Sequence, residues 1–393
     1  MIYLDHHATT PCAETVVDRM LPFFSARFGN PSSKSHGVGR DAARAVEEAR
    51  AALATLLAVS ARELTFTAGA TEALNLALRG LVKAYPERRR AVVSAFEHKA
   101  VLDTARALEE DGLEVVMVPC DARGIVTPAL LEAALDGRPA LFVAIMAAQN
   151  ELGTIQPIAE LAAVAKRHQA FFVCDAVQAV GRIPFRPGEL GVDLAALSAH
   201  KLYGPKGVGA LWVRGPRTGG PTLLPIMTGG GQEQGLRPGT LNVPGIVGLG
   251  AAAELAAMRL DEDGPHLHQL RDLLLSELRA HLQRLGAPAD LLAVTCGEGQ
   301  DAPPRLPGSL HLTCAGLEGF RLLQVLGDRL ALSSGSACSS ERRESSHVLD
   351  AIHLPEDRRF AALRIGLGRD NTEAEVRLAA DLVASAIDRL RPR

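Results

Sequence analysis

The sequence predicts an α/β protein of two domains, a large domain built on a mainly parallel seven-stranded sheet and a smaller α+β domain. Between about residues 36 and 258, short apolar runs alternate with stretches whose apolar residues recur every three or four positions. After Pro244 the pattern changes to a long helical stretch rich in Leu and Ala. A chain of 393 residues is long enough for two domains with sizeable cores.

Seven apolar runs in the first part are expected to form the strands of the large sheet. They cover residues 64–67, 91–94, 115–118, 141–146, 171–174, 194–197 and 210–213. Helical patterns lie between them, for example at residues 99–110, 128–135 and 158–168. This alternation is typical of a parallel sheet covered by helices, and ligands of such sheets bind at the carboxyl ends of the strands.

The second part of the chain predicts a connector and a small domain. The helical stretch from Ile246 to about Leu285 is expected to connect the domains, with an interruption near Asp261–Pro265. Beyond it lie strand patterns at residues 309–313, 331–333 and 363–366 and helical patterns at 319–326 and 372–390. We assign residues 14–257 to the large domain, and residues 1–13 together with 258–393 to the small domain.

Composition excludes several classes of protein. With a formal charge of -3, the chain lacks the excess of positive charge that attracts nucleic acid or an anionic membrane, so neither is expected as a partner. The six cysteines form no Cys-x-x-Cys pair, which argues against a zinc site or a secreted disulfide framework, and no metal is expected. The first residues lack a basic segment followed by an apolar core, so we expect a reducing, cytoplasmic location.

One lysine lies in a setting suited to covalent chemistry. Lys201 follows His200 and precedes a glycine-rich turn, while Asp175 ends an earlier apolar run at a strand end. A carboxylate and an amine in this arrangement suggest pyridoxal phosphate, because its ring nitrogen prefers an anion and its aldehyde reacts with an amine. The alternatives are a surface lysine and an aspartate that caps a helix.

Two further motifs fit such a cofactor. Thr67–Ala73 follows a strand and opens a helix, so its small residues would expose backbone N–H groups to an anion, with the Thr71 hydroxyl as an added donor. The alternative is a plain glycine turn in which Thr71 is the helix N-cap. His98 follows the strand at 91–94, where an imidazole would stack on a planar ligand or move a proton, or would simply start a helix.

Polar residues follow the next strands as well. Asn150 and Gln178 come after strand-like runs, and although turn chemistry also explains Asn150, such groups at five consecutive strand ends indicate a ligand pocket. Cys338 lies in a Ser- and Gly-rich run, where a thiol is suited to nucleophilic attack unless it is an idle loop cysteine. Arg364 lies within an apolar strand pattern and needs a carboxylate, either structural or from a substrate.

Ten motifs in order resemble the signature of the cysteine desulfurases, in the class V branch of fold-type I pyridoxal-phosphate enzymes. They are Tyr3–Pro11, Phe28–Ser32, Gly69–Glu72, Glu97–Leu102, Asn150–Gly153, Asp175–Gln178, Ser198–Lys201, Gly229–Gly231, Arg237–Thr240 and Ser333–Cys338. The last motif resembles the group that supplies sulfur for iron–sulfur clusters and thiolated tRNA. The sequence departs from the family pattern at Gln149, where a second Asn is usual, and at His6-His7.

The resemblance implies a role for each candidate residue. Lys201 forms the covalent link to pyridoxal phosphate, His98 stacks on its ring, Asp175 pairs with the ring nitrogen and Gln178 contacts the ring hydroxyl. The implied phosphate ligands are Ala70, Thr71, Ser198, His200 and, from the neighbouring subunit, Thr240. A ligand supplied by the partner implies a symmetric homodimer. Asn150 and Arg364 bind the substrate carboxylate, and Cys338 accepts the sulfur.

The implied activity is conversion of L-cysteine to L-alanine with transfer of the sulfur to Cys338 as a persulfide. In this scheme Lys201 is the base for the Cα proton, and His98 exchanges a proton with the substrate thiol. The expected partner is a sulfur-acceptor protein, either an iron–sulfur scaffold or a tRNA-thiolating enzyme. A selenocysteine lyase or another class V lyase is the alternative, and a non-catalytic binding module is disfavoured because Lys201 and Cys338 are both present.

Overall fold

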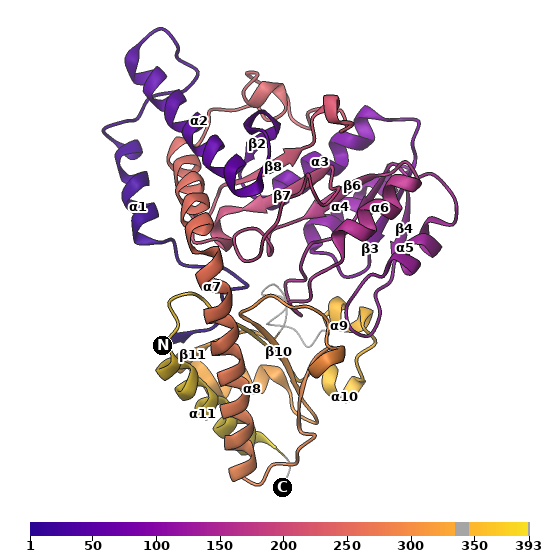
Figure 1. The fold of residues 1–393 in the computed structure, drawn as a ribbon, viewed down its shortest axis with the longest axis vertical. Helices are drawn as coiled ribbons and strands as arrows, with labels where there is room; N and C mark the ends of the chain where they lie inside the picture. Colours follow the sequence, from indigo (N-terminus) through magenta and orange to yellow (C-terminus); the bar gives the residue numbers. More distant parts are fainter. Residues whose placement is uncertain (335–345, 392–393) are drawn as a thin grey trace.

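The computed structural model describes residues 1–334 and 346–391, and Cys338 lies outside the described residues. Figure 1 shows two bodies, an upper one formed mostly by the first half of the chain and a lower one formed mostly by the last third. The long helix α7 (Val243–Arg284) passes through both. The predicted α/β fold class is confirmed.

The large sheet has seven strands in the order β2-β8-β7-β6-β5-β3-β4. Their bounds are β2 (Leu64–Thr67), β3 (Arg90–Ser94), β4 (Glu114–Val118), β5 (Phe142–Ala144), β6 (Phe171–Asp175), β7 (Leu194–Ser198) and β8 (Gly209–Val213). Only β8 runs antiparallel to its neighbours, β2 and β7; the other pairs are parallel. The mainly parallel, seven-stranded sheet is therefore as predicted, although β5 is shorter than the apolar run that predicted it.

Helices cover both faces of this sheet, which is why its strands are apolar throughout. Alternate residues of β3 pack in opposite directions: Ala91 and Val93 pack with α3 (Ala70–Ala84) and α4 (Lys99–Glu110), and Val92 packs into the other layer. That layer contains α2 (Gly37–Leu57), α5 (Pro128–Leu135), α6 (Ile158–Arg167) and the first part of α7. The shorter elements before and between them are α1 (Glu14–Met20), η1 (Leu21–Phe24), η2 (Ala61–Glu63), η4 (Pro216–Thr218) and η5 (Glu233–Gly235).

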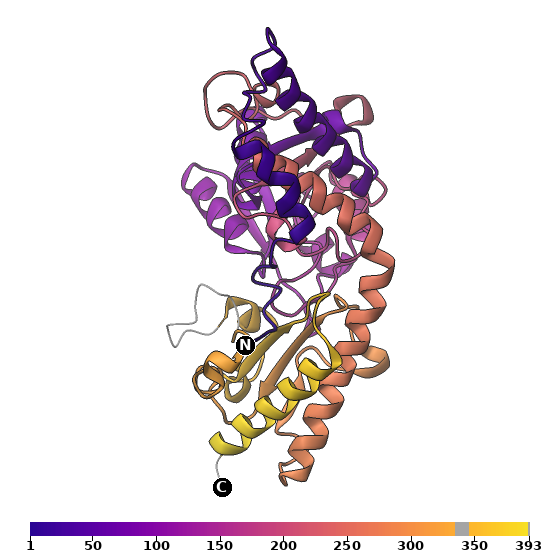
Figure 2. The same cartoon turned by 90° about the vertical axis from the view of Figure 1, so that its left-hand side faces the viewer.

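The connector helix is continuous, so the interruption expected near Asp261–Pro265 is wrong. Pro265 lies inside α7, although a proline removes one intrahelical N–H donor. Ion pairs of Asp263 with Arg259 at 3.2 Å and Arg369 at 2.9 Å hold this turn of the helix. By length and composition α7 resembles a membrane span, but 61% of its apolar window is buried, as in a core helix. Figure 2 shows α7 running along one side of both bodies.

The small body is built around a three-stranded antiparallel sheet in the order β12-β10-β9. Leu270, Leu274, Leu278 and Leu282 repeat every fourth residue on α7 and form the core there with α8 and α11. The strands and helices are β9 (Leu292–Val294), η6 (Gly299–Asp301), β10 (Ser309–Cys314), α8 (Gly319–Leu326), η7 (Gly327–Arg329), α9 (His347–Ala351), α10 (Glu356–Arg359), β12 (Ala362–Gly366) and α11 (Glu373–Leu390).

The first residues of the chain belong to this small body and then enter the space between the two. β1 (Ile2–Tyr3) pairs in parallel with β11 (Leu330–Ala331), and Asp5 forms a bridge with Gly366 at the end of β12. The chain then turns at residues 6–8 towards the carboxyl edge of the large sheet. This turn forms part of the site described below.

Candidate active site

A cavity of about 1150 Å³ lies at the carboxyl edge of the large sheet, beside β12 and the N-terminal turn. Ten of the twelve residues predicted for the site line it: Ala70, Thr71, His98, Asn150, Asp175, Gln178, Ser198, His200, Lys201 and Arg364. Thr240 is not among its lining residues, and Cys338 is outside the described part of the chain. The fold thus brings together residues that are up to 294 positions apart (364 − 70 = 294).

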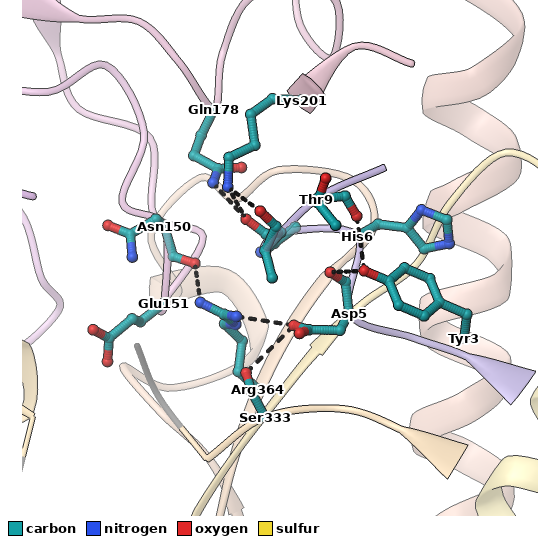
Figure 3. A network of polar contacts seen from close by, with 12 residues as sticks. Tyr3, Asp5, His6, Thr9, Asn150, Glu151, Gln178, Lys201, Ser333 and Arg364 are labelled. Carbon is teal, nitrogen blue, oxygen red and sulfur yellow. Dashed lines mark hydrogen bonds and ion pairs between the residues drawn. The ribbon is translucent and has the colours of Figure 1, made fainter. Parts of the chain in front are cut away.

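Lys201 points across the cavity at the N-terminal turn. It ends η3 (Ala199–Lys201), directly after β7, and its Nζ donates hydrogen bonds to the carbonyl oxygens of His7 at 2.5 Å and Ala8 at 2.7 Å (Figure 3). Burial lowers the pKa of Lys201 to about 7, and the charges of Arg182 and Arg364 act in the same direction. The surface-lysine alternative is therefore wrong, and a large share of the amine is neutral and nucleophilic near pH 7.

Asp175, the last residue of β6, lies beside a second buried carboxyl group, that of Glu97. Asp175 Oδ1 accepts a hydrogen bond from the Val177 N–H at 3.0 Å, and Glu97 Oε1 accepts one from the Met146 N–H at 2.7 Å. Burial and then the charge of Asp175 raise the pKa of Glu97 well above its usual range. Burial also raises the pKa of Asp175, but nearby His98 and Lys201 oppose this effect. Glu97 therefore keeps its proton, and Asp175 is the anion that a cationic ring nitrogen would contact.

The N-terminus of α3 forms a cradle at one end of the cavity. Gly69 is its N-cap with φ 157° and ψ 178°, a conformation open essentially only to glycine, so Thr71 is not the N-cap and that alternative is wrong. A side chain at Gly209 would not fit behind it, because a Cβ there would lie 2.4 Å from the Leu197 carbonyl oxygen and 2.8 Å from Gly69 Cα. The first N–H groups of the 15-residue helix have no intrahelical partner and suit a phosphate.

Ser198 and His200 add hydrogen-bonding groups near the cradle. His200 Nδ1 lies 3.1 Å from Thr9 Oγ1, and burial followed by the charges of Lys201 and Lys206 lowers the pKa of this histidine to about 4. The imidazole is therefore neutral near pH 7 and acts through hydrogen bonding rather than charge. Ser198 Oγ would lie 3.9 Å from a Cβ placed on Gly69, so it is next to the start of α3.

His98 and Gln178 have fixed orientations in the cavity. His98 is the N-cap of α4, and its Nδ1 accepts a hydrogen bond from the Ala100 N–H at 3.1 Å, so the neutral ring carries its proton on Nε2. His98 therefore starts a helix, and it also lines the cavity. Gln178 Nε2 donates to the His7 carbonyl oxygen at 3.0 Å, and its buried Oε1 has no partner among the described residues. Such an oxygen is suited to a hydroxyl donor on a ligand.

Arg364 lies in β12 with a side chain that is only 2% exposed. Its Nη2 is 2.9 Å from Asp5 Oδ1 and its Nη1 is 3.4 Å from the Asn150 carbonyl oxygen (Figure 3). Its buried Nε has no hydrogen-bond partner within the described ranges. The structure therefore supplies the carboxylate expected for this arginine, and one donor is left for a second carboxylate, such as that of an amino acid.

Three polar residues of this region were missed at the sequence level. Glu97 precedes His98 at a strand end, which is a signal that the sequence does contain. The roles of Asp5 and Arg182 were not visible, because Asp5 meets Arg364 across 359 positions and Arg182 meets the His6 carbonyl oxygen across 176. Such contacts leave no local spacing pattern.

Comparisons with known proteins agree with this geometry. The family described as "Aminotransferase class-V" matches residues 2–378. Proteins named "Cysteine desulfurase IscS" from Anaeromyxobacter dehalogenans and Rickettsia akari are 45% and 41% identical to this chain, each over 99% of it and over 93% and 92% of their own lengths. A solved structure titled "NIFS-LIKE PROTEIN" is 36% identical with a TM-score of 0.86, over 99% of this chain and 98% of that one. The chain therefore belongs to the class-V aminotransferase family and, within it, to the cysteine desulfurases.

Proposed function

We propose that this chain binds pyridoxal phosphate, converts L-cysteine to L-alanine and retains the sulfur on Cys338 as a persulfide. The observation that carries the proposal is a single cavity that collects the Lys201 amine, the Asp175 carboxylate, the start of α3 and the Arg364 guanidinium. The residues present fit this cofactor, because the Gly69 cradle suits its phosphate and the unpartnered oxygen of Gln178 suits its ring hydroxyl.

The cofactor, when bound, supplies an electron sink for a carbanion at the substrate Cα. Its aldehyde carbon would be held by Lys201, its ring nitrogen by Asp175 and its ring face by His98. The groups assigned to its phosphate are Ala70, Thr71, Ser198 and His200, and all four line the cavity. Together these residues would hold the cofactor in one orientation, because they would supply a charge partner, hydrogen bonds and a stacking surface.

Residues of this chain account for substrate binding, proton transfer and sulfur transfer. Arg364 and Asn150 would bind its carboxylate, and Lys201, with its lowered pKa, would accept the Cα proton. His98 Nε2–H would donate a hydrogen bond to the substrate sulfur, and the thiol proton would stay on that sulfur as it becomes the outer atom of the persulfide. The Cys338 thiolate would attack the substrate sulfur, so that a new S–S bond forms and the C–S bond breaks with its electron pair left on carbon. Protonation of that carbon gives alanine.

The test uses the purified full-length protein with pyridoxal phosphate, L-cysteine and a reducing thiol. Alanine and sulfide should appear in equal amounts, and Cys338→Ala should abolish both turnover products while the visible absorbance of the bound cofactor stays. Cys12→Ala is the matched control, because Cys12 is a partly exposed free thiol in another part of the chain. Full sulfide release by Cys338→Ala would overturn the assigned role.

We also infer a symmetric homodimer in which Thr240 reaches the partner's phosphate cradle. Apolar side chains exposed near the start of the chain support an interface: Leu21 (56% exposed), Phe24 (63%), Phe28 (72%) and Val38 (47%). Thr240 does not line its own cavity, which is consistent with a role in the other one. A reducing cytoplasm suits this chemistry, and the five cysteines in the described ranges are free thiols.

Mixing two inactive variants tests this assignment. Lys201→Ala lacks the covalent amine, and Thr240→Ala is expected to bind the cofactor weakly. In a mixed dimer, the site on the Thr240→Ala subunit keeps its own Lys201 and receives an intact Thr240, so activity should return. Activity no higher than that of the separate variants would refute the contribution of Thr240 across the interface.

Sulfur released from Cys338 is proposed to pass to an iron–sulfur scaffold. Transfer of label from labelled cysteine to a purified scaffold protein would show this step.

A further inference from the structure

Arg182 is a cation behind the active-site lysine that has no carboxylate partner. It lies in the segment after β6 that also carries Gln178. Within residues 1–334 and 346–391, no carboxylate oxygen lies within 4 Å of its guanidinium. The nearby carboxylate of Asp263, which lines the same small void, is already paired with Arg369 at 2.9 Å and Arg259 at 3.2 Å. Arg182 therefore keeps its positive charge without a neighbouring anion.

Arg182 instead donates hydrogen bonds to two backbone carbonyl groups, that of Lys201 itself and that of His6 in the N-terminal turn. Its Nη2 donates to the His6 carbonyl oxygen at 2.7 Å and to the Lys201 carbonyl oxygen at 3.3 Å, and its Nε lies 3.4 Å from the latter. The carbonyl oxygens of His7 and Ala8 accept hydrogen bonds from the Lys201 amine. Three successive carbonyl groups thus accept hydrogen bonds from Arg182 and Lys201. For Arg182, the dipoles of the His6 and Lys201 carbonyl groups take the place of a counter-ion.

The preceding glycine allows this arrangement. Gly181 has φ 77°, which disfavours any side chain, and a Cβ there would lie 3.0 Å from Leu202 Cβ. The segment can therefore pack directly on the turn that follows Lys201. Packing of the backbone, and not an ion pair, holds Arg182 against that turn.

We propose that Arg182 is a positioning residue for Lys201: it ties the Lys201 turn to the N-terminal segment and places a guanidinium without a carboxylate partner against the Lys201 backbone carbonyl group. This inference rests on the proposed function, because its consequence is how Lys201 holds pyridoxal phosphate. The positive charge disfavours a proton on the Lys201 nitrogen, and it does so without contacting the substrate or the reacting atoms.

The electrostatics of the site agree with this role. Burial lowers the pKa of Arg182 to about 10; Tyr203 opposes this shift, and the charges of Arg364 and Arg369 add to it, so the guanidinium is still charged at pH 7. After burial, Arg182 is the largest cause of the lowered pKa of Lys201. The other groups that face Lys201 are the cation Arg364, the carboxylates Asp175 and Asp5, and the neutral imidazoles His7 and His200.

The experiment is a pH titration of the visible absorbance of the full-length protein loaded with pyridoxal phosphate. Arg182→Gln keeps hydrogen-bond donors but removes the charge, so protonation of the Lys201 nitrogen becomes easier and the spectral midpoint should rise by about one pH unit. Arg182→Lys retains the charge and should keep the wild-type midpoint. Arg186→Gln removes an exposed charge four residues further along and should also leave the midpoint unchanged.

The outcomes separate this inference from the proposed function. A wild-type protein that develops no visible band with pyridoxal phosphate would refute the proposed function. A band with the same midpoint in wild type and Arg182→Gln would refute only the role of Arg182. If Arg182→Gln does not retain the cofactor, Arg182→Lys decides: an unchanged midpoint supports the role of the charge, and a displaced midpoint overturns it.

Discussion

The ion pair between Asp5 and Arg364 should be needed for stability and not for binding of cysteine. Arg364 lies almost fully buried in β12, and Asp5 Oδ1 is 2.9 Å from its Nη2. Replacing Asp5 by Asn keeps an oxygen at the same place but removes its charge. The buried guanidinium then has only neutral acceptors among the described residues, the amide oxygen of the new Asn and the Asn150 carbonyl oxygen at 3.4 Å.

The magnitude follows from the burial of the two partners. Leaving one charge of a buried ion pair uncompensated costs about 3–5 kcal/mol. Here the Arg364 side chain is 2% exposed, but that of Asp5 is 17% exposed, and the amide oxygen of Asn can still accept a hydrogen bond. We therefore expect a loss of about 2 kcal/mol, which is roughly 30-fold in the ratio of folded to unfolded protein.

Urea unfolding and steady-state kinetics on the same preparation measure both effects. The unfolding midpoint of Asp5→Asn should fall with an unchanged slope. The KM for L-cysteine should stay the same or decrease, because the freed guanidinium attracts the substrate carboxylate more strongly. Asp103→Asn removes a partner from an exposed ion pair and should alter neither value. An unchanged midpoint for Asp5→Asn, or a raised KM, would refute this reasoning.

Three further predictions concern the cradle, the loop beside it and the lysine. Gly209→Ala should lower stability by about 1–3 kcal/mol and weaken retention of the cofactor, measured by dialysis, whereas Gly188→Ala, which has open space, should do neither. Glu233→Gln breaks a buried pair and should cost about 3 kcal/mol in urea unfolding; an equal loss for Glu47→Gln, which breaks an exposed contact to the same arginine, would contradict this. Because Lys201 has a pKa of about 7, cofactor uptake by the apoprotein should speed up as pH rises through 7; a midpoint near 10 would refute it.

Most of the fold follows from periodicity in the sequence. The apolar runs that predicted β2, β3, β6 and β7 are buried on both faces, and such runs have few alternatives to a covered parallel sheet. The interruption predicted in α7 failed because Pro265 has a local preference to end a helix, and contacts with Arg369 from the other end of the chain override it. Local propensity cannot include partners so distant in sequence.

The residues of the site also divide into those that the sequence predicts and those that only the structure reveals. Asp175 ends β6, and Lys201 and His98 come shortly after β7 and β3, so the topology of a parallel sheet is enough to bring them to one edge. The sequence does not decide whether Arg364 binds a structural or a substrate carboxylate. The structure shows that Asp5 accepts from Nη2 and that the buried Nε has no partner among the described residues. The sequence also does not show that Glu97 is buried. Its pKa is raised because water is excluded from its carboxyl group and because the charge of Asp175 is near.

The N-terminal turn joins these separate contacts into one unit. Asp5 neutralises Arg364, and the next three carbonyl groups accept hydrogen bonds from Arg182, Lys201 and Gln178. The same segment begins as a strand paired in the small domain, so its position depends on how the small domain packs. A displacement between the domains would leave Asp5 with Arg364, because both belong to the small domain. It would move the carbonyl dipoles of residues 6–8 away from Arg182 and Lys201, which belong to the large domain. Packing of the two domains and the protonation of Lys201 are therefore coupled, and a substitution in β1 or β11 should alter the cofactor spectrum without touching the cavity.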